Sequence, residues 1–298
     1  HTFRNMVTQV NYTNKLGLPA PLAAALTRDS YSKGDASFSA TGLLRPPRMA
    51  VLFDDPNNIM FRDVSSNLWT LFGTAVHSIL ENSKHPDFIT EERLYCSVGG
   101  VKLSGAIDVQ HVQPDGSRIL QDYKTRKVYG VMHNDSDEKQ LNIYAYIAHK
   151  NGIEVSGLQI INFIKDWNKH DALRKPDYPQ HDIWIQDIAL WPISKTEAFV
   201  KERITAHQQA IAGNLPDCTD EERWLRDDKF AVMKEKRVRA VRVFDSMVEA
   251  ETFISAQKDA DKHRVDHRRG SPLRCEQFCD VSDYCDQFAA FKQGEEVE

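Results

Sequence analysis

Two sharp turns divide the middle of the chain into three successive strand patterns, and this succession limits the fold more than any other feature. Residues 90–98 and 101–112 carry apolar residues typical of strands, and Gly99 with Gly100 between them predicts a tight β-hairpin. The Pro-Asp-Gly turn at 114–116 then leads into a third strand over 117–125. The three strands are therefore expected to lie side by side and antiparallel.

Helical patterns flank these strands. Apolar residues recur at helical spacing over 67–82, and a second helix is expected over 137–150, where Asn151 and Gly152 form a stop signal. Two more strands and a helix are expected over residues 155–164, 181–190 and 195–212. This order predicts an α/β fold with a central mixed sheet flanked by helices, and it differs from a Rossmann-type alternation.

The pattern changes on both sides of this core. Residues 1–66 are interrupted by proline and glycine, so short helices and loops are expected there. The core is assigned to 67–213 and a C-terminal accessory subdomain to 214–298. The accessory subdomain is expected to begin with a short charged helix. Two short strands around 230–243, a helix over 246–262 and a basic histidine-rich stretch at 263–269 are expected to follow.

Bulk composition limits the function classes. The net charge of -5 and a pI near 6.1 do not favour a basic nucleic-acid binder. They still allow an enzyme with a local basic path, because bound metal ions can neutralise phosphates. No apolar run is long enough to cross a bilayer, so no membrane contact is expected and a cytoplasmic location is predicted.

Three charged residues lie in strand patterns that are otherwise apolar. Asp108 lies in the second strand, and Asp122 and Lys124 lie two residues apart in the third, so this pair projects from one face. Adjacent carboxylates can bind a hard divalent cation that activates water for phosphodiester hydrolysis. A neighbouring lysine can orient that water and stabilise the transition state. The alternative is a cross-strand ion pair on a solvated face.

The flanking helices add polar residues at one-turn spacing. His77 and Glu81 are four residues apart in the first helix, and Gln140 and Tyr144 are four apart in the second. Taken singly, each pair could be an ordinary helix face. Their order along the chain favours a shared site with the charged strand residues.

The ordered motifs resemble those of the RecB-like branch of the PD-(D/E)XK nuclease superfamily. The four motifs are GxxxH, GxxD, DYK and QxxxY, at residues 73–77, 105–108, 122–124 and 140–144. The segment at 39–48 is similar to the opening of these proteins, and phage-encoded members are similar to the part that follows Pro216. The resemblance implies a restriction-endonuclease-like core.

It also implies roles by position. His77, Asp108 and Asp122 would bind Mg²⁺ or Mn²⁺, helped by the main-chain carbonyl of Tyr123, and Lys124 would be the catalytic lysine. Gln140 and Tyr144 would contact the DNA strand or steady the lysine. Glu81 is assigned at most a supporting position.

Three cysteines fall within eleven residues near the C-terminus. Cys275, Cys279 and Cys285 offer thiolates at a spacing that suits zinc or an iron-sulfur cluster, and Cys218 is the expected fourth ligand. Cys96, on a predicted strand, is expected in the core. Some RecB-like nucleases carry a four-cysteine [4Fe-4S] cluster, although with two residues between the first pair of the C-terminal trio, where this chain has three. A structural [4Fe-4S] cluster is therefore predicted, with Zn²⁺ or free cysteines as alternatives.

The predicted function is a Mg²⁺- or Mn²⁺-dependent DNA exonuclease acting on linear or single-stranded DNA in recombination, repair or phage DNA metabolism. A recombination or helicase protein is a possible partner. Basic residues around 126–127, 234–242 and 263–269 could line a path for phosphates, or could be solvated surface. The alternatives are a non-catalytic DNA-binding or assembly module that retains the nuclease scaffold, and a zinc-organised binding protein.

Overall fold

The computed structural model describes residues 10–28, 32–132 and 136–295. These residues form two compact units, one made of the described residues within 10–47 and 59–215 and the other of 48–58 and 216–295. In the described part of the chain, no helix is both long and apolar enough to cross a membrane.

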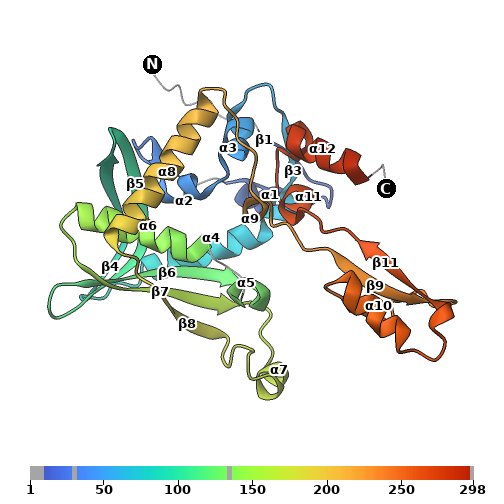
Figure 1. Cartoon of the computed structure of the whole chain (residues 1–298). Helices are drawn as coiled ribbons and strands as arrows, with labels where there is room; N and C mark the ends of the chain where they lie inside the picture. The colour runs from blue at the N-terminus through green and yellow to red at the C-terminus, as the bar shows by residue number, and fades with distance from the viewer. Residues whose placement is uncertain (1–9, 29–31, 133–135, 296–298) are drawn as a thin grey trace. The chain divides into compact units, whose positions relative to one another are not determined.

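The larger unit is built on a six-stranded mixed sheet, seen with its helices in Figure 1. Its strands are β2 (Phe38–Ser39), β4 (Phe88–Val98), β5 (Val101–Val112), β6 (Arg118–Arg126), β7 (Val155–Ile164) and β8 (Ile183–Ile188). The order is β2-β5-β6-β7-β8, and β4 pairs with the other edge of β5. The β4–β5, β5–β6 and β7–β8 pairs are antiparallel, and the β6–β7 and β2–β5 pairs are parallel. The predicted mixed α/β architecture is confirmed.

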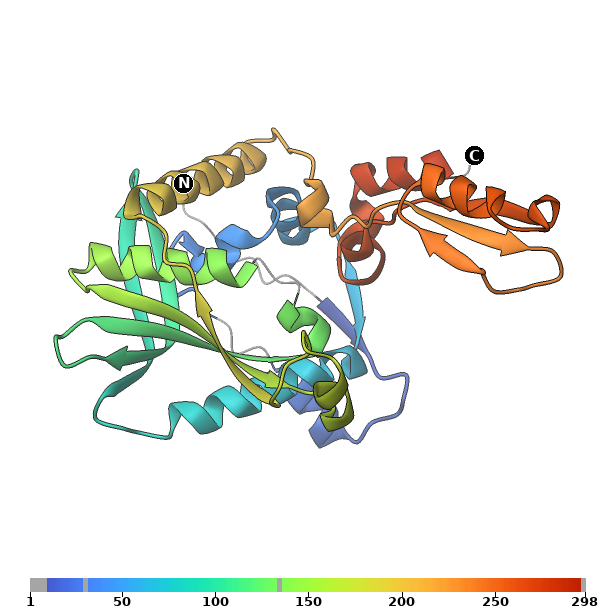
Figure 2. The same ribbon diagram turned by 60° about the horizontal axis from the view of Figure 1, so that its bottom comes forward.

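Helices cover the sheet. The main ones are α4 (Leu68–Glu81), α6 (Ser136–Lys150) and α8 (Ile193–Ile211), and Figure 2 shows α4 and α6 on opposite sides of the sheet. Shorter elements of this unit are α1 (Ala20–Thr27), α2 (Ala40–Leu44), α5 (Val128–Met132), α7 (Lys169–Arg174), η1 (Val64–Asn67) and the parallel strands β1 (Val10–Thr13) and β3 (Met60–Asp63). The β1–β3 pair was not predicted from the sequence.

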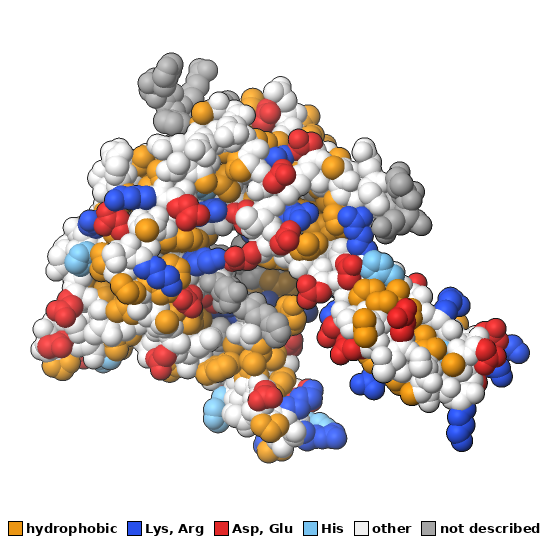
Figure 3. Space-filling view, in the orientation of Figure 1, with side chains coloured by type: hydrophobic (Ala, Val, Ile, Leu, Met, Phe, Trp, Pro, Cys, Tyr) orange, Lys and Arg blue, Asp and Glu red, His pale blue; other side chains and the backbone are white. Residues whose placement is uncertain are grey.

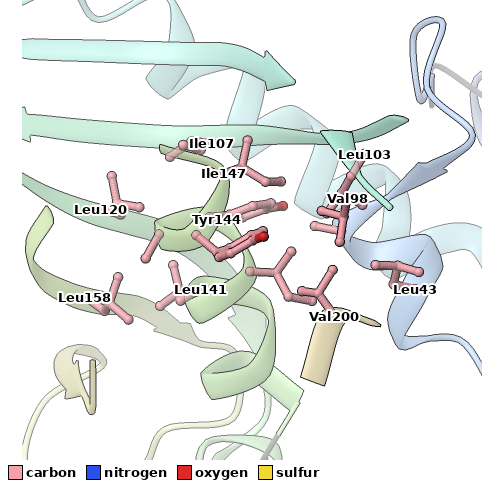
Figure 4. Close-up of a cluster of buried hydrophobic side chains, with 14 of the residues drawn as sticks. Leu43, Val98, Leu103, Ile107, Leu120, Leu141, Tyr144, Ile147, Leu158 and Val200 are labelled. Atoms are coloured by element: carbon pink, nitrogen blue, oxygen red, sulfur yellow. The ribbon is translucent and has the colours of Figure 1, made fainter. Parts of the chain in front are cut away.

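The core lies between the sheet and α6. Leu141, Tyr144 and Ile147 of this helix pack against Ile107 and Leu120 of the sheet, as Figure 4 shows. All residues of α6 from Leu141 to Ala148 are buried, so the helix is buried on every side there. This suits a helix that packs between a sheet and a further helix, α8.

The smaller unit contains a three-stranded antiparallel sheet in the order β10-β9-β11. Its elements are β9 (Lys229–Lys234), β10 (Arg242–Phe244), β11 (His263–Arg268), α9 (Asp220–Arg223), α10 (Met247–Ser255), η2 (Ala260–Lys262), α11 (Leu273–Gln277), η3 (Ser282–Tyr284) and α12 (Asp286–Glu295). The helix α3 (Pro47–Asp54) precedes β3 in the chain. Buried Arg48 joins distant parts of this unit: it donates to the Pro216 carbonyl at 2.9 Å and pairs with Asp217 at 2.7 Å and with Asp286.

One sequence prediction for the smaller unit was wrong in extent, and a further strand lies where none was predicted. The helix expected over 246–262 ends at Ser255, where the Ala256 N–H bonds back to the Ile254 and Thr252 carbonyls. The stretch at 263–269 is mainly a strand, β11, which pairs with β9 along its whole length. Alternating charged residues and a single valine concealed this strand, because its partner supplies the pairing. On the face seen in Figure 3, acidic and basic side chains are interspersed, in keeping with the net charge.

Gly270 lies so close to a neighbouring segment that no side chain fits. An added Cβ would overlap the Arg226 carbonyl oxygen, while the Arg226 N–H donates to the Ser271 carbonyl at 3.0 Å. We expect Gly270→Ala to destabilise the smaller unit by about 1–3 kcal/mol, because backbone must move. Thermal unfolding against Gly157→Ala, whose added Cβ would make only ordinary contacts with Ile119, measures this. Equal melting temperatures for the Gly270 variant and the natural chain would contradict the prediction.

Candidate active site

The two strand carboxylates lie where the β5–β6 pair comes apart. The ladder ends at the pair Val109–Gln121, one step before Asp108 and Asp122 would face each other. The Tyr123 N–H, which has left this ladder, donates instead to Asp108 Oδ2 at 2.9 Å. The opening of the sheet therefore exposes backbone polar groups that the Asp108 side chain satisfies.

His77 of α4 reaches the same point. Its Nε2 lies 3.0 Å from the Tyr123 carbonyl oxygen, and its Nδ1 lies 3.4 Å from Asp108 Oδ2 and 3.8 Å from Glu91 Oε1. Ligand atoms of His77, Glu91 and Asp108 all lie within 4.8 Å of one another, the single such group of three among the described residues. One imidazole and two carboxylates form a donor set that suits a divalent cation.

Glu91 is the member of this group that the sequence analysis missed. It lies inside β4, between the pairs Thr90–Val109 and Glu92–Ile107, and has a left-handed φ of 53°. This conformation is uncommon for a residue other than glycine and is found at functional sites. It interrupts the pairing opposite Asp108 and brings the Glu91 carboxylate to His77. Two adjacent acidic residues in a strand, Glu91 and Glu92, were the available sequence signal.

Asp122 and Lys124 form an ion pair next to this group. The Lys124 Nζ lies 2.5 Å from Asp122 Oδ2, and the Asp122 side chain is only 2% exposed. Gln140 of α6 donates from Nε2 to Asp122 Oδ1 at 3.0 Å and to the Tyr144 hydroxyl at 2.9 Å. Its Oε1 lies 3.5 Å from the Lys124 Nζ. In this structure, Gln140 and Tyr144 thus steady the Asp122–Lys124 pair, while a contact of either with DNA stays a prediction.

Gly105 explains how α6 reaches this position. A Cβ on Gly105 would lie 2.8 Å from Tyr144 Cδ1 and 3.0 Å from Ile147 Cδ1. The glycine of the GxxD motif therefore allows α6 to approach β5 closely, and this approach places the glutamine of the QxxxY motif over Asp122.

The site holds protons more tightly than isolated side chains would. Burial, followed by the nearby Asp122 charge, raises the pKa of Asp108 to about 7. A hydrogen bond with Glu91 raises the pKa of His77. Burial is the largest single influence on Lys124 and lowers its pKa. The charge and hydrogen bond of Asp122, together with the charges of Asp137 and Asp108, outweigh burial, so the net pKa is raised. Buried carboxylates that gain protons in this way are well placed to exchange them for a divalent cation.

The structure brings most of the predicted residues together. Six of them meet where β5 and β6 diverge: His77, Asp108, Asp122, the Tyr123 carbonyl, Lys124 and Gln140. Asp122 was expected to be the third metal ligand with His77 and Asp108. Among the described residues, Glu91 takes that position in the candidate metal group, and Asp122 pairs with Lys124 instead. Glu81, on the exposed end of α4, does not belong to that group.

The four predicted cluster cysteines lie in one part of the smaller unit. Burial first, then Glu222 and the charges of Cys285 and Cys275, raise the pKa of Cys218 to about 12. The Gln287 side chain, two residues after Cys285, accepts from the Cys218 N–H and donates to the Cys218 carbonyl, both at 2.9 Å. Among the described residues, no three thiols lie within 4.8 Å of one another, so a closed mononuclear site is not formed.

Cys96 lies apart from these four. It is on β4 and packs against the core of the larger unit, and burial raises the pKa of its thiol to about 11.

A match to a known protein family agrees with this geometry. The family model of the PD-(D/E)XK nuclease superfamily matches residues 71–286. A solved structure titled "Crystal structure of SSO0001" is similar, with 17% sequence identity and a TM-score of 0.42, over 62% of this chain and 83% of that chain. No curated protein matches.

Proposed function

Because this chain belongs to the PD-(D/E)XK nuclease superfamily, we propose that it is a divalent-metal-dependent deoxyribonuclease, and an exonuclease that acts on DNA ends or single strands. The observation that carries this proposal is the His77–Glu91–Asp108 group beside the Asp122–Lys124 pair. Ligands for a cation and a lysine oriented by an ion pair are two components that support metal-assisted phosphodiester hydrolysis.

The residues present fit Mg²⁺ or Mn²⁺. His77, Glu91 and Asp108 would hold the ion, and Asp122 or the Tyr123 carbonyl, both adjacent, could join them. A bound divalent ion supplies an activated water and neutralises charge on the scissile phosphate.

The remaining chemistry belongs to the chain itself. The Lys124 ammonium, kept protonated by Asp122, can donate a hydrogen bond to the attacking water or to a phosphate oxygen. Asp122 and Gln140 fix the position of Lys124, and α6 fixes Gln140 through Tyr144. Preorganisation of this kind reduces the reorganisation that the transition state needs.

A nuclease assay tests the proposal. Linear duplex, circular duplex and single-stranded DNA are incubated with the full chain and Mg²⁺ or Mn²⁺, with EDTA as the control. We expect linear and single-stranded DNA to be degraded and closed circles to survive. Cleavage of closed circles would replace exonuclease by endonuclease, and no cleavage of any substrate would overturn the proposed function.

We also propose that Cys218, Cys275, Cys279 and Cys285 bind a structural [4Fe-4S] cluster. The support is that all four belong to the smaller unit, and that Gln287, two residues after Cys285, holds the Cys218 backbone by two hydrogen bonds. A zinc ion would need its sulfur ligands about 3.8 Å apart, given Zn–S bonds of about 2.3 Å. A cluster of four irons accepts thiolates spaced more widely. Its role would be to hold the C-terminal segment in place.

Metal analysis and visible absorbance of anaerobically purified protein test the cluster. We expect iron, brown colour and their loss in Cys285→Ala, while Cys96→Ala keeps both because Cys96 lies in the other unit. Zinc without iron would support the alternative ion. A role in recombination, repair or phage DNA metabolism, and a helicase or recombination partner, stay predictions from the sequence resemblance.

A further inference from the structure

One stripe of α4 connects the metal group to an exposed aromatic residue. Trp69, Gly73 and His77 follow each other at four-residue spacing, so they share one side of the helix. His77 ends the stripe at the metal group. Trp69 begins it about 12 Å away along the axis, at about 1.5 Å per residue. Its side of the helix therefore leads directly to the candidate active site.

Gly73, in the middle of the stripe, has no structural reason to be glycine. A Cβ at this position would meet none of the described residues within 4 Å, and its φ is not positive. Glycine inside a helix lowers stability relative to alanine. Here no close packing offsets that loss, in contrast to Gly105 under α6. The feature that Gly73 preserves is open space between Trp69 and His77.

The outer end of the stripe combines an aromatic ring with positive charge. Trp69 is 51% exposed, and the Lys165 Nζ lies 3.9 Å from its ring centroid. Lys165 directly follows β7, and its N–H donates to the Arg126 carbonyl at 2.9 Å, at the end of the strand that carries Lys124. Burial, followed by the nearby charge of exposed Lys127, lowers the pKa of Lys165. Lys127 thus lies near Lys165, and the charge of Asp166, whose carboxylate accepts from the Val128 N–H at 2.7 Å, acts on this pKa in the opposite direction.

We propose that this stripe binds the end of a single DNA strand as it enters the active site. A base stacks on Trp69, the backbone passes over Gly73, and Lys127 and Lys165 contact its phosphates. Aromatic stacking with lysine–phosphate contacts is the chemistry by which proteins hold single strands without reading sequence. The proposal rests on the proposed nuclease function for its substrate, but it concerns binding and is measured without catalysis.

A protein partner is the competing occupant. Trp69 contacts Phe72, whose ring centroid is 5.5 Å away and which is also half exposed, so the two could form an apolar patch. The Lys165 ammonium over the ring and the open position at Gly73 favour a thin, anionic strand over a protein surface.

Gly73→Ala is the sharpest test, because it separates stability from binding. The added methyl meets no atom of the described residues and improves helix propensity, so the melting temperature should rise by about 1–3 °C. Affinity for a fluorescent oligothymidylate, measured by anisotropy in EDTA, should fall about tenfold because the methyl occupies the strand path. Ser78→Ala, an exposed position on the same helix, is the matched control and should leave affinity unchanged.

Two further variants test the outer end. Trp69→Leu should weaken oligothymidylate binding about tenfold, while Trp69→Phe keeps most of it. Lys127→Gln and Lys165→Gln should each reduce the slope of log affinity against log salt by about 0.7.

The outcomes separate this inference from the proposed function. Unchanged oligothymidylate affinity in both Gly73→Ala and Trp69→Leu overturns the strand path, even if the natural chain degrades DNA. Reduced affinity in both supports the path, even if no DNA is degraded. Equal loss of affinity for blunt duplex and for oligothymidylate would show a general DNA surface and would overturn the single-strand assignment.

Discussion

Replacing Lys124 by alanine is expected to slow DNA hydrolysis by about 10²- to 10³-fold, the range for removal of one oriented donor from a transition state. Lys124 lies outside the His77–Glu91–Asp108 group, so Mg²⁺ binding should persist. The rate is measured with saturating linear DNA and Mg²⁺. Binding of Mg²⁺ is followed separately by the thermal shift it produces.

Two controls distinguish the loss of a catalytic group from the loss of an ordinary lysine and from a loss of stability. Lys102→Ala removes a lysine of β5 that pairs with Asp35, and it should leave the rate unchanged. Lys124→Ala also leaves the buried Asp122 carboxylate without its cation, which lowers stability. Adding Asp122→Asn to Lys124→Ala removes that stranded charge, so stability should recover while activity stays low. Full activity in a folded Lys124→Ala variant would show that this lysine takes no part in the reaction.

The sequence contained enough to locate most of the site. The two-residue spacing of Asp122 and Lys124 places both on one face of their strand. The four-residue spacing of Gln140 and Tyr144 places both on one side of their helix. The turn at Gly99 and Gly100, both with positive φ, sets the hairpin that leads to Asp108. These are local properties, and local properties can be inferred from short stretches of sequence.

What escaped prediction depends on contacts between distant elements. Glu91 joins the candidate metal group because β4 changes conformation opposite Asp108, and no local pattern shows this break. The tie between Gly105 and Tyr144 is also invisible in sequence, although each lies in a separate motif. The strand β11 depends on pairing with β9 and has little apolar pattern of its own.

The proton affinity of Asp108 leads to a second large effect, on the stability of the metal-free protein. Its pKa is about 7 in the folded chain because of burial and the Asp122 charge, against about 3.9 for an unfolded aspartate. The folded state therefore binds this proton more tightly. The stabilisation is complete below about pH 4 and is lost as the pH rises towards 7. The raised pKa of His77 acts in the same direction.

Between pH 5.5 and 8 in EDTA, the free energy of unfolding should therefore fall, by up to about 2 kcal/mol from Asp108 alone at about 1.36 kcal/mol per pH unit. Asp108→Asn can still accept the hydrogen bond from the Tyr123 N–H but cannot ionise, so its stability should depend less on pH. Denaturant unfolding at each pH measures both proteins. An equally steep dependence in the two would assign the effect to other groups.

Mg²⁺ should reverse the trend. A cation bound by His77, Glu91 and Asp108 needs the ionised carboxylates and a neutral imidazole, so binding releases protons and strengthens as the pH rises. We expect the Mg²⁺-induced increase in melting temperature to be larger at pH 8 than at pH 5.5. It should be lost in Asp108→Asn and reduced in Glu91→Gln. A pH-independent shift would mean that the ion binds elsewhere, and the ligand group derived from the diverging strands would then be wrong.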